Sequence, residues 1–74
     1  MNPQTAQTQN WLPETLTGAP IEAGQRYLWC DLSHRHAPRK VTVDHLDERD
    51  GLVICKDDTD THYMVAPEEL HELN

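Results

Sequence analysis

The stretch of residues 39–70 most constrains the fold, because it alternates short apolar runs with polar turns. The apolar runs are residues 41–43, 52–55 and 62–66, and the polar turns between them are residues 44–51 and 56–60. The runs are rich in β-branched residues and too short for helices. Gly51, after Asp50, provides a residue that reaches positive φ at little steric cost. The pattern predicts three consecutive short strands.

The C-terminal residues predict a tight turn followed by one more strand. Pro67 suits the first turn of a helix, where its missing N–H costs nothing, and Glu68 and Glu69 are acids at a helix N-terminus. We therefore expect one 3₁₀ turn over residues 67–70. Residues 71–73 then add a last short strand.

A first strand is expected over residues 24–30. Alternation places Tyr27 and Trp29 on one face, and Leu28 and Cys30 on the other. Both faces are then apolar, and such a strand needs cover outside the sheet as well as inside. The segment around Trp11 or a second copy of the chain would supply that cover, so a homo-oligomer is a possible state.

This order of strands resembles the small barrels of the SH3-like class, in which a meander ends in a 3₁₀ turn and a last strand. The resemblance covers residues 24–73. It implies an all-β, SH3-like barrel of about five short strands over residues 21–74. Residues 1–20 are expected to form a flexible N-terminal arm carrying a Trp11–Leu12 anchor. Within it, Pro13 is expected to start one helical turn.

Charge and composition narrow the classes of partner. Thirteen acids against six Lys and Arg leave a net charge of -7, which argues against direct binding of nucleic acid and suits a basic protein partner. No apolar run approaches the length of a signal peptide or a membrane span, so we expect a cytoplasmic protein without membrane contact. In that compartment Cys30 and Cys55 are expected to be free thiols, with a disulfide between them as the alternative.

A zinc site is an alternative hypothesis for the same cysteines. Cys30, His34 and His36 follow a C-x₃-H-x-H spacing, and Cys55 approaches from a neighbouring strand. Paired C-x-x-C knuckles are missing, so the sequence favours a core role for the thiols and a surface role for the histidines. We expect no cofactor.

The sequence shows few features that are typical of an enzyme. No nucleophile lies in a recognisable elbow, and no Gly-rich phosphate loop is present. The C-terminal outline is similar to that of type II dihydrofolate reductases. Their Val-Gln-Ile-Tyr segment does not recur at residues 62–65, so this activity is not transferred to the chain. We expect no enzyme.

The loop of residues 31–38 is the best candidate for a binding edge, because the corresponding loop borders the ligand groove in SH3-like barrels. The expected contact surface consists of Tyr27, Trp29, His34, Arg35, His36 and Tyr63. The hypothesis is a non-enzymatic protein–protein interaction module. Two alternatives stay open: an acidic inhibitor from a phage or mobile element that occupies a nucleic-acid-binding surface, and a zinc-stabilised small domain.

Overall fold

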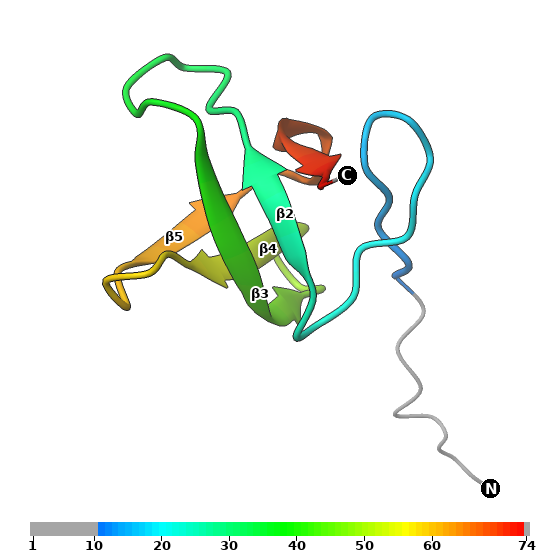
Figure 1. Ribbon diagram of the computed structural model, residues 1–74. Helices are drawn as coiled ribbons and strands as arrows, with labels where there is room; N and C mark the ends of the chain where they lie inside the picture. Colours follow the sequence, from blue (N-terminus) through cyan, green and yellow to red (C-terminus); the bar gives the residue numbers. More distant parts are fainter. Residues whose placement is uncertain (1–10, 74) are drawn as a thin grey trace, which may run out of the picture.

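The computed structural model describes residues 11–73, which fold into one antiparallel β-sheet with a single 3₁₀ turn (Figure 1). The elements are β2 (Arg26–Trp29), β3 (Arg39–Asp47), β4 (Leu52–Lys56), β5 (His62–Val65), η1 (Pro67–Glu69) and β6 (Leu70–Glu72). The strand order is β5-β4-β3-β2-β6, so the five strands form one unclosed sheet. Within these residues, no helix is long and apolar enough to cross a membrane.

The central strand β3 is longer than the sequence predicts. The polar turn was expected to begin at Asp44, but the strand continues to Asp47, and the turn occupies residues 48–51. A register shift lies between Val43 and His45, so Asp44 is the extra residue of a β-bulge. The bulge keeps Leu46 on the core side of the sheet, where it packs against the buried cluster. The charged residues therefore belong to the strand rather than end it.

The C-terminal prediction of a 3₁₀ turn and a last strand is confirmed, with bounds shifted by one residue. The Glu69 amide donates to the Ala66 carbonyl at 2.9 Å, which closes the turn. The chain then returns beside β2, where Leu28 pairs with His71. The Cys30 amide donates to the Glu69 carbonyl at 2.9 Å, extending this pairing beyond the end of β2.

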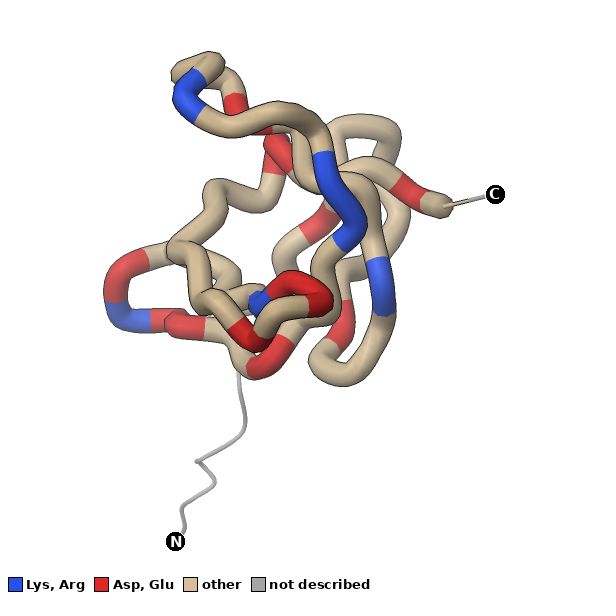
Figure 2. Tube along the Cα trace, turned by 60° about the vertical axis from the view of Figure 1, so that its left-hand side comes forward, with Lys and Arg blue, Asp and Glu red and all other residues tan. Residues whose placement is uncertain are grey.

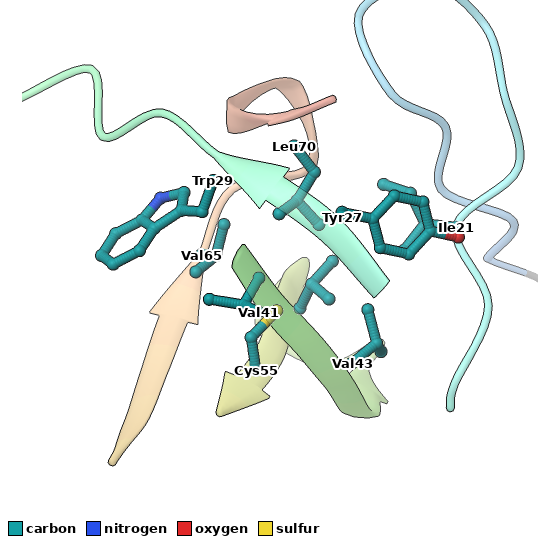
Figure 3. Packing of buried hydrophobic residues seen from close by; sticks show 9 residues of the cluster. Ile21, Tyr27, Trp29, Val41, Val43, Cys55, Val65 and Leu70 are labelled. Atoms are coloured by element: carbon teal, nitrogen blue, oxygen red, sulfur yellow. The ribbon is translucent and has the colours of Figure 1, made fainter. Parts of the chain in front are cut away.

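The core is the inner face of the curved sheet (Figure 3). Alternate residues of every strand point into it: Tyr27, Trp29, Val41, Val43, Val53, Cys55, Val65 and Leu70, joined by Ile21 from the preceding connector. Tyr27 and Trp29 thus share one face, as the alternation predicts. Most of these side chains are small, so the interior is thin and depends on dense packing.

The segment before the sheet is not helical, and the expected helical turn at Pro13 is wrong. An isolated bridge joins Glu14 to Pro20, and the buried Thr15 hydroxyl accepts a hydrogen bond from the Ala19 amide at 3.1 Å. A hydroxyl beside main-chain donors favours a turn over a helix. Trp11 packs at the margin of the core. The remainder of the expected N-terminal arm, residues 1–10, lies outside the described residues.

We expect truncation of Leu70 to destabilise the fold strongly, because its side chain is fully buried. Leu70→Ala should lower the free energy of unfolding by about 3 kcal/mol through lost burial and a residual cavity. Leu16→Ala is the matched control, because Leu16 is 71% exposed, and it should change stability by less than about 0.5 kcal/mol. Urea denaturation monitored by tryptophan fluorescence measures both values. Equal losses would show that Leu70 does not anchor the core.

Candidate functional site

Three rings from separate parts of the chain meet at one edge of the sheet. Trp29 lies at the end of β2, His36 in the loop before β3, and Tyr63 in β5. The Trp29 ring centroid is 5.1 Å from that of His36 and 4.8 Å from that of Tyr63, and His36 and Tyr63 are 5.5 Å apart. Such tilted and edge-on contacts stabilise aromatic groups beyond their area burial. We call Trp29, His36 and Tyr63 the ring cluster.

The ring cluster forms part of an open groove of about 400 Å³ between β5 and the loop of residues 31–38. Its lining residues are Trp29, Asp31, Ser33, Arg35, His36, His62, Tyr63, Met64 and Glu69. Trp29 is almost fully buried beneath the groove, whereas Met64 is 72% exposed at its edge. The groove therefore combines a rigid aromatic floor with accessible apolar, cationic and acidic groups.

Glu69 holds the floor of the groove in place. Its carboxylate accepts hydrogen bonds from the Trp29 indole N–H at 3.2 Å, from the Leu32 amide at 2.9 Å and from the Ala66 amide at 3.2 Å. One side chain thereby ties β2, the start of the loop and the 3₁₀ turn together. Hydrogen bonds to a charged acceptor are stronger than neutral ones, so this link orients the Trp29 ring.

Asp31 organises the loop that carries His36. Its carboxylate accepts hydrogen bonds from the Ser33 hydroxyl at 2.6 Å and the Ser33 amide at 2.9 Å, and it pairs with His36 Nδ1 at 2.9 Å. The hydrogen bond from the Ser33 hydroxyl, followed by that from His36, holds the pKa of Asp31 well below its ordinary value of 3.8. The carboxylate form therefore keeps His36 over the groove.

Asp57 supports the opposite wall through Tyr63. The Tyr63 hydroxyl donates to the Asp57 carboxylate at 2.9 Å and accepts from the Arg39 guanidinium at 3.0 Å. The Arg39 guanidinium also lies 5.6 Å from the centre of the Tyr63 ring. The pKa of Asp57 lies well below its ordinary value, chiefly because the Thr59 hydroxyl donates to it at 2.6 Å, with Tyr63 contributing. The phenol is thus fixed by groups on both sides.

Four of the six residues expected at the contact surface line this groove: Trp29, Arg35, His36 and Tyr63. Tyr27 does not, because it is buried and its hydroxyl donates to the Pro20 carbonyl at 3.0 Å. His34 is exposed in the same loop at φ 61 but is not a lining residue.

Sequence reasoning missed the carboxylates that position the rings. The Asp-x-Ser and Asp-x-Thr spacings at Asp31 and Asp57 are typical of local turns closed by an Asp side chain, and they were a usable signal. Glu69 carried no such signal, because its partners Trp29 and Leu32 lie far away in the sequence.

The cysteines do not form a disulfide, and both are free. Among residues 11–73, no group of three or more His, Cys, Asp or Glu side chains is placed to hold a metal ion, so Cys30, His34, His36 and Cys55 do not come together as a ligand set. Cys55 is fully buried in the core, and burial raises the pKa of its thiol to about 12. This thiol therefore acts as a small apolar side chain.

Comparison with models of known protein families finds no match, and comparisons with the curated proteins and with the solved structures find none either.

We expect Glu69→Ala to lower the free energy of unfolding by about 2 kcal/mol, because three donors lose a charged acceptor. The neighbouring Glu68→Ala is the matched control, because Glu68 is exposed and none of these three hydrogen bonds involves it. Denaturant unfolding measures stability, and tryptophan fluorescence reports the setting of the Trp29 indole. Unchanged stability and emission in Glu69→Ala would contradict the assigned role.

The depressed pKa values of Asp31 and Asp57 make stability depend on pH in the acid range. Each group contributes stability that is fully present above its ordinary value of 3.8 and is lost as the pH falls through the lower folded value. We expect the free energy of unfolding to decline as the pH is lowered from about 4 to about 2.

Asp57→Ala should make this decline shallower, whereas Asp58→Ala should preserve it. Asp58 belongs to the same turn, but its carboxylate accepts a hydrogen bond from Arg26 rather than from Thr59 or Tyr63. Urea titrations at a series of pH values give the slopes. A decline in Asp57→Ala as steep as in the unmodified protein would refute the contribution of Asp57.

Proposed function

We propose that this protein is a non-enzymatic protein–protein interaction module that binds its partner in the groove between β5 and the loop of residues 31–38. The observation that carries the proposal is the ring cluster, which gathers side chains from three segments into one groove wall. Aromatic and arginine side chains dominate binding energy at protein interfaces. Arg35 lines the groove beside the rings.

The groove is supported by the kind of hydrogen bonding that keeps a binding surface in one conformation. Glu69, Asp31 and Asp57 hold Trp29, His36 and Tyr63 respectively. A surface ordered before binding loses less side-chain entropy when a partner docks, so more of the contact energy appears as affinity. This support is what a preformed binding surface requires.

We further propose that the sheet belongs to the SH3-like class of small barrels and that the protein acts in the cytoplasm. The barrel assignment is supported by the meander from β2 to β5, the 3₁₀ turn after β5 and the return of β6 beside β2. The net charge of -7 favours a basic partner.

The second candidate is an acidic inhibitor that occupies a nucleic-acid-binding surface. Acidic residues gather in the turns at the two ends of β4 (Figure 2). Binding through these turns should weaken steeply with salt, because exposed charges are screened over about 10 Å at 0.1 M. Binding through the ring cluster should depend less on salt.

The proposal is tested by affinity capture from the native host with the immobilised protein. Arg35→Ala and His36→Ala should lower recovery of the specific partner about tenfold, because both residues line the groove. Arg49→Ala is the matched control, because Arg49 is an exposed arginine in the β3–β4 turn, outside the groove. Trp29 is not substituted in this test, because its side chain is buried and Trp29→Ala would unfold the protein.

Retention of the partner by the folded groove variants, or its loss in Arg49→Ala, would show that the contact surface lies elsewhere. Circular dichroism of each variant establishes that the sheet is intact before capture is compared.

A further inference from the structure

The groove runs along an open edge of the sheet. Among the strands of residues 11–73, β5 is terminal and pairs with β4 on one side only (Figure 1). An edge strand presents main-chain N–H and C=O groups that can hydrogen-bond to an added strand. The ring cluster stands beside this edge, because Tyr63 belongs to β5 itself.

Hydrogen-bonding positions alternate along β5, and this alternation determines which of its main-chain N–H and C=O groups face the open edge. The Asp57 amide donates to the Thr61 carbonyl at 3.1 Å, one position before the first pair of the β4–β5 ladder, Lys56 and His62. This bond places Asp57 and Thr61 at a hydrogen-bonding position of the ladder, although the Thr61 amide donates to the Asp57 carboxylate instead. Hydrogen-bonded and non-hydrogen-bonded pairs alternate along antiparallel strands. Tyr63 therefore uses its main-chain groups on β4, whereas His62 and Met64 direct theirs toward the open edge.

His62 and Met64 are also lining residues of the groove. A chain laid along this edge would therefore make main-chain hydrogen bonds at these two residues. Its residue opposite Tyr63 would form a non-hydrogen-bonded pair, in which side chains on the same face approach most closely. That side chain would meet the ring cluster, so an apolar or aromatic residue fits there.

The acidic residues near the ends of β5 indicate which side chains suit the two ends of an added strand. Asp58 and Asp60 precede β5, and the exposed Glu68 follows it. Asp58 and Asp60 form long ion pairs with Arg26 at 3.4 Å and with Lys56 at 3.8 Å, but their side chains stay 86% and 84% exposed and can still attract a basic group. An added strand longer than β5 would pass these acids at both ends. Basic side chains at its two ends would be attracted to them.

We propose that an extended segment of the partner protein adds to the open edge of β5 as a further strand, with an apolar or aromatic side chain against the ring cluster and basic residues at both ends. This inference rests on the proposed function, because it names how the same groove receives its partner.

The probe is the synthetic peptide acetyl-Lys-Arg-Val-Tyr-Val-Arg-Lys-amide, titrated into the full chain and followed by NMR. Its control carries N-methyl groups on both valine nitrogens, which removes the two donors next to the tyrosine. We expect the unmodified peptide to bind and to slow amide hydrogen exchange at His62 and Met64. The methylated peptide should bind about tenfold more weakly, because main-chain hydrogen bonds are lost.

Met64→Pro tests the same contact from the side of the protein. Proline removes the outward N–H and is tolerated at such edge positions, because the ladder to β4 does not use that group. We expect Met64→Pro to weaken the peptide about tenfold, whereas Met64→Ala, which keeps the N–H, should weaken it less than about threefold. If Met64→Pro does not fold, the difference in affinity between the unmodified and the methylated peptide tests the inference by itself.

Three results would overturn the inference: no binding of the unmodified peptide, equal affinity of the two peptides, or peptide binding without slower exchange at His62 and Met64. Slow exchange that appears without peptide and rises with protein concentration would instead assign the edge to a second copy of the chain. The proposed function fails separately, when Arg35→Ala and His36→Ala retain the captured partner.

Discussion

The return of the C-terminal turn onto β2 is the contact on which both the core and the groove depend. Two consecutive residues at the end of this turn have different roles. Leu70, the first residue of β6, is fully buried in the core. The carboxylate of Glu69, the last residue of η1, accepts hydrogen bonds from the Trp29 indole and the Leu32 amide. A chain this short buries a modest share of its surface, so one turn that serves both roles has a large effect on stability. Without that return, Trp29 would lose the acceptor that orients it.

The acidic character of the chain has an internal as well as an external role. The carboxylates of Asp31 and Asp57 accept hydrogen bonds from their own loops and from a ring of the groove wall, which lowers the pKa of both. Asp58 and Asp60, by contrast, are highly exposed beside β5, where they form ion pairs with Arg26 and Lys56. The same residue type therefore stabilises the site at some positions and sets its charge at others.

Much of the architecture could be predicted because it depends on local signals. The apolar run of β4 and Pro67 at the start of η1 act within a few residues, and both predictions are confirmed. The prediction for β3 stopped too early, because Asp44 occupies a bulge whose cost is offset by cross-strand pairing. The helical turn at Pro13 was wrong, because the Thr15 hydroxyl closes a loop instead. Both errors arose where tertiary contacts override local propensity.

The sequence by itself determined the number and rough position of the strands and turns, because alternation and turn chemistry are properties of neighbouring residues. It also identified four of the nine residues that line the groove, namely Trp29, Arg35, His36 and Tyr63. Only the tertiary structure decided that Trp29, His36 and Tyr63 touch, that Tyr27 is buried away from them, and in which register β5 pairs with β4. These outcomes depend on pairing register and on contacts between residues far apart in the chain, which no local pattern specifies.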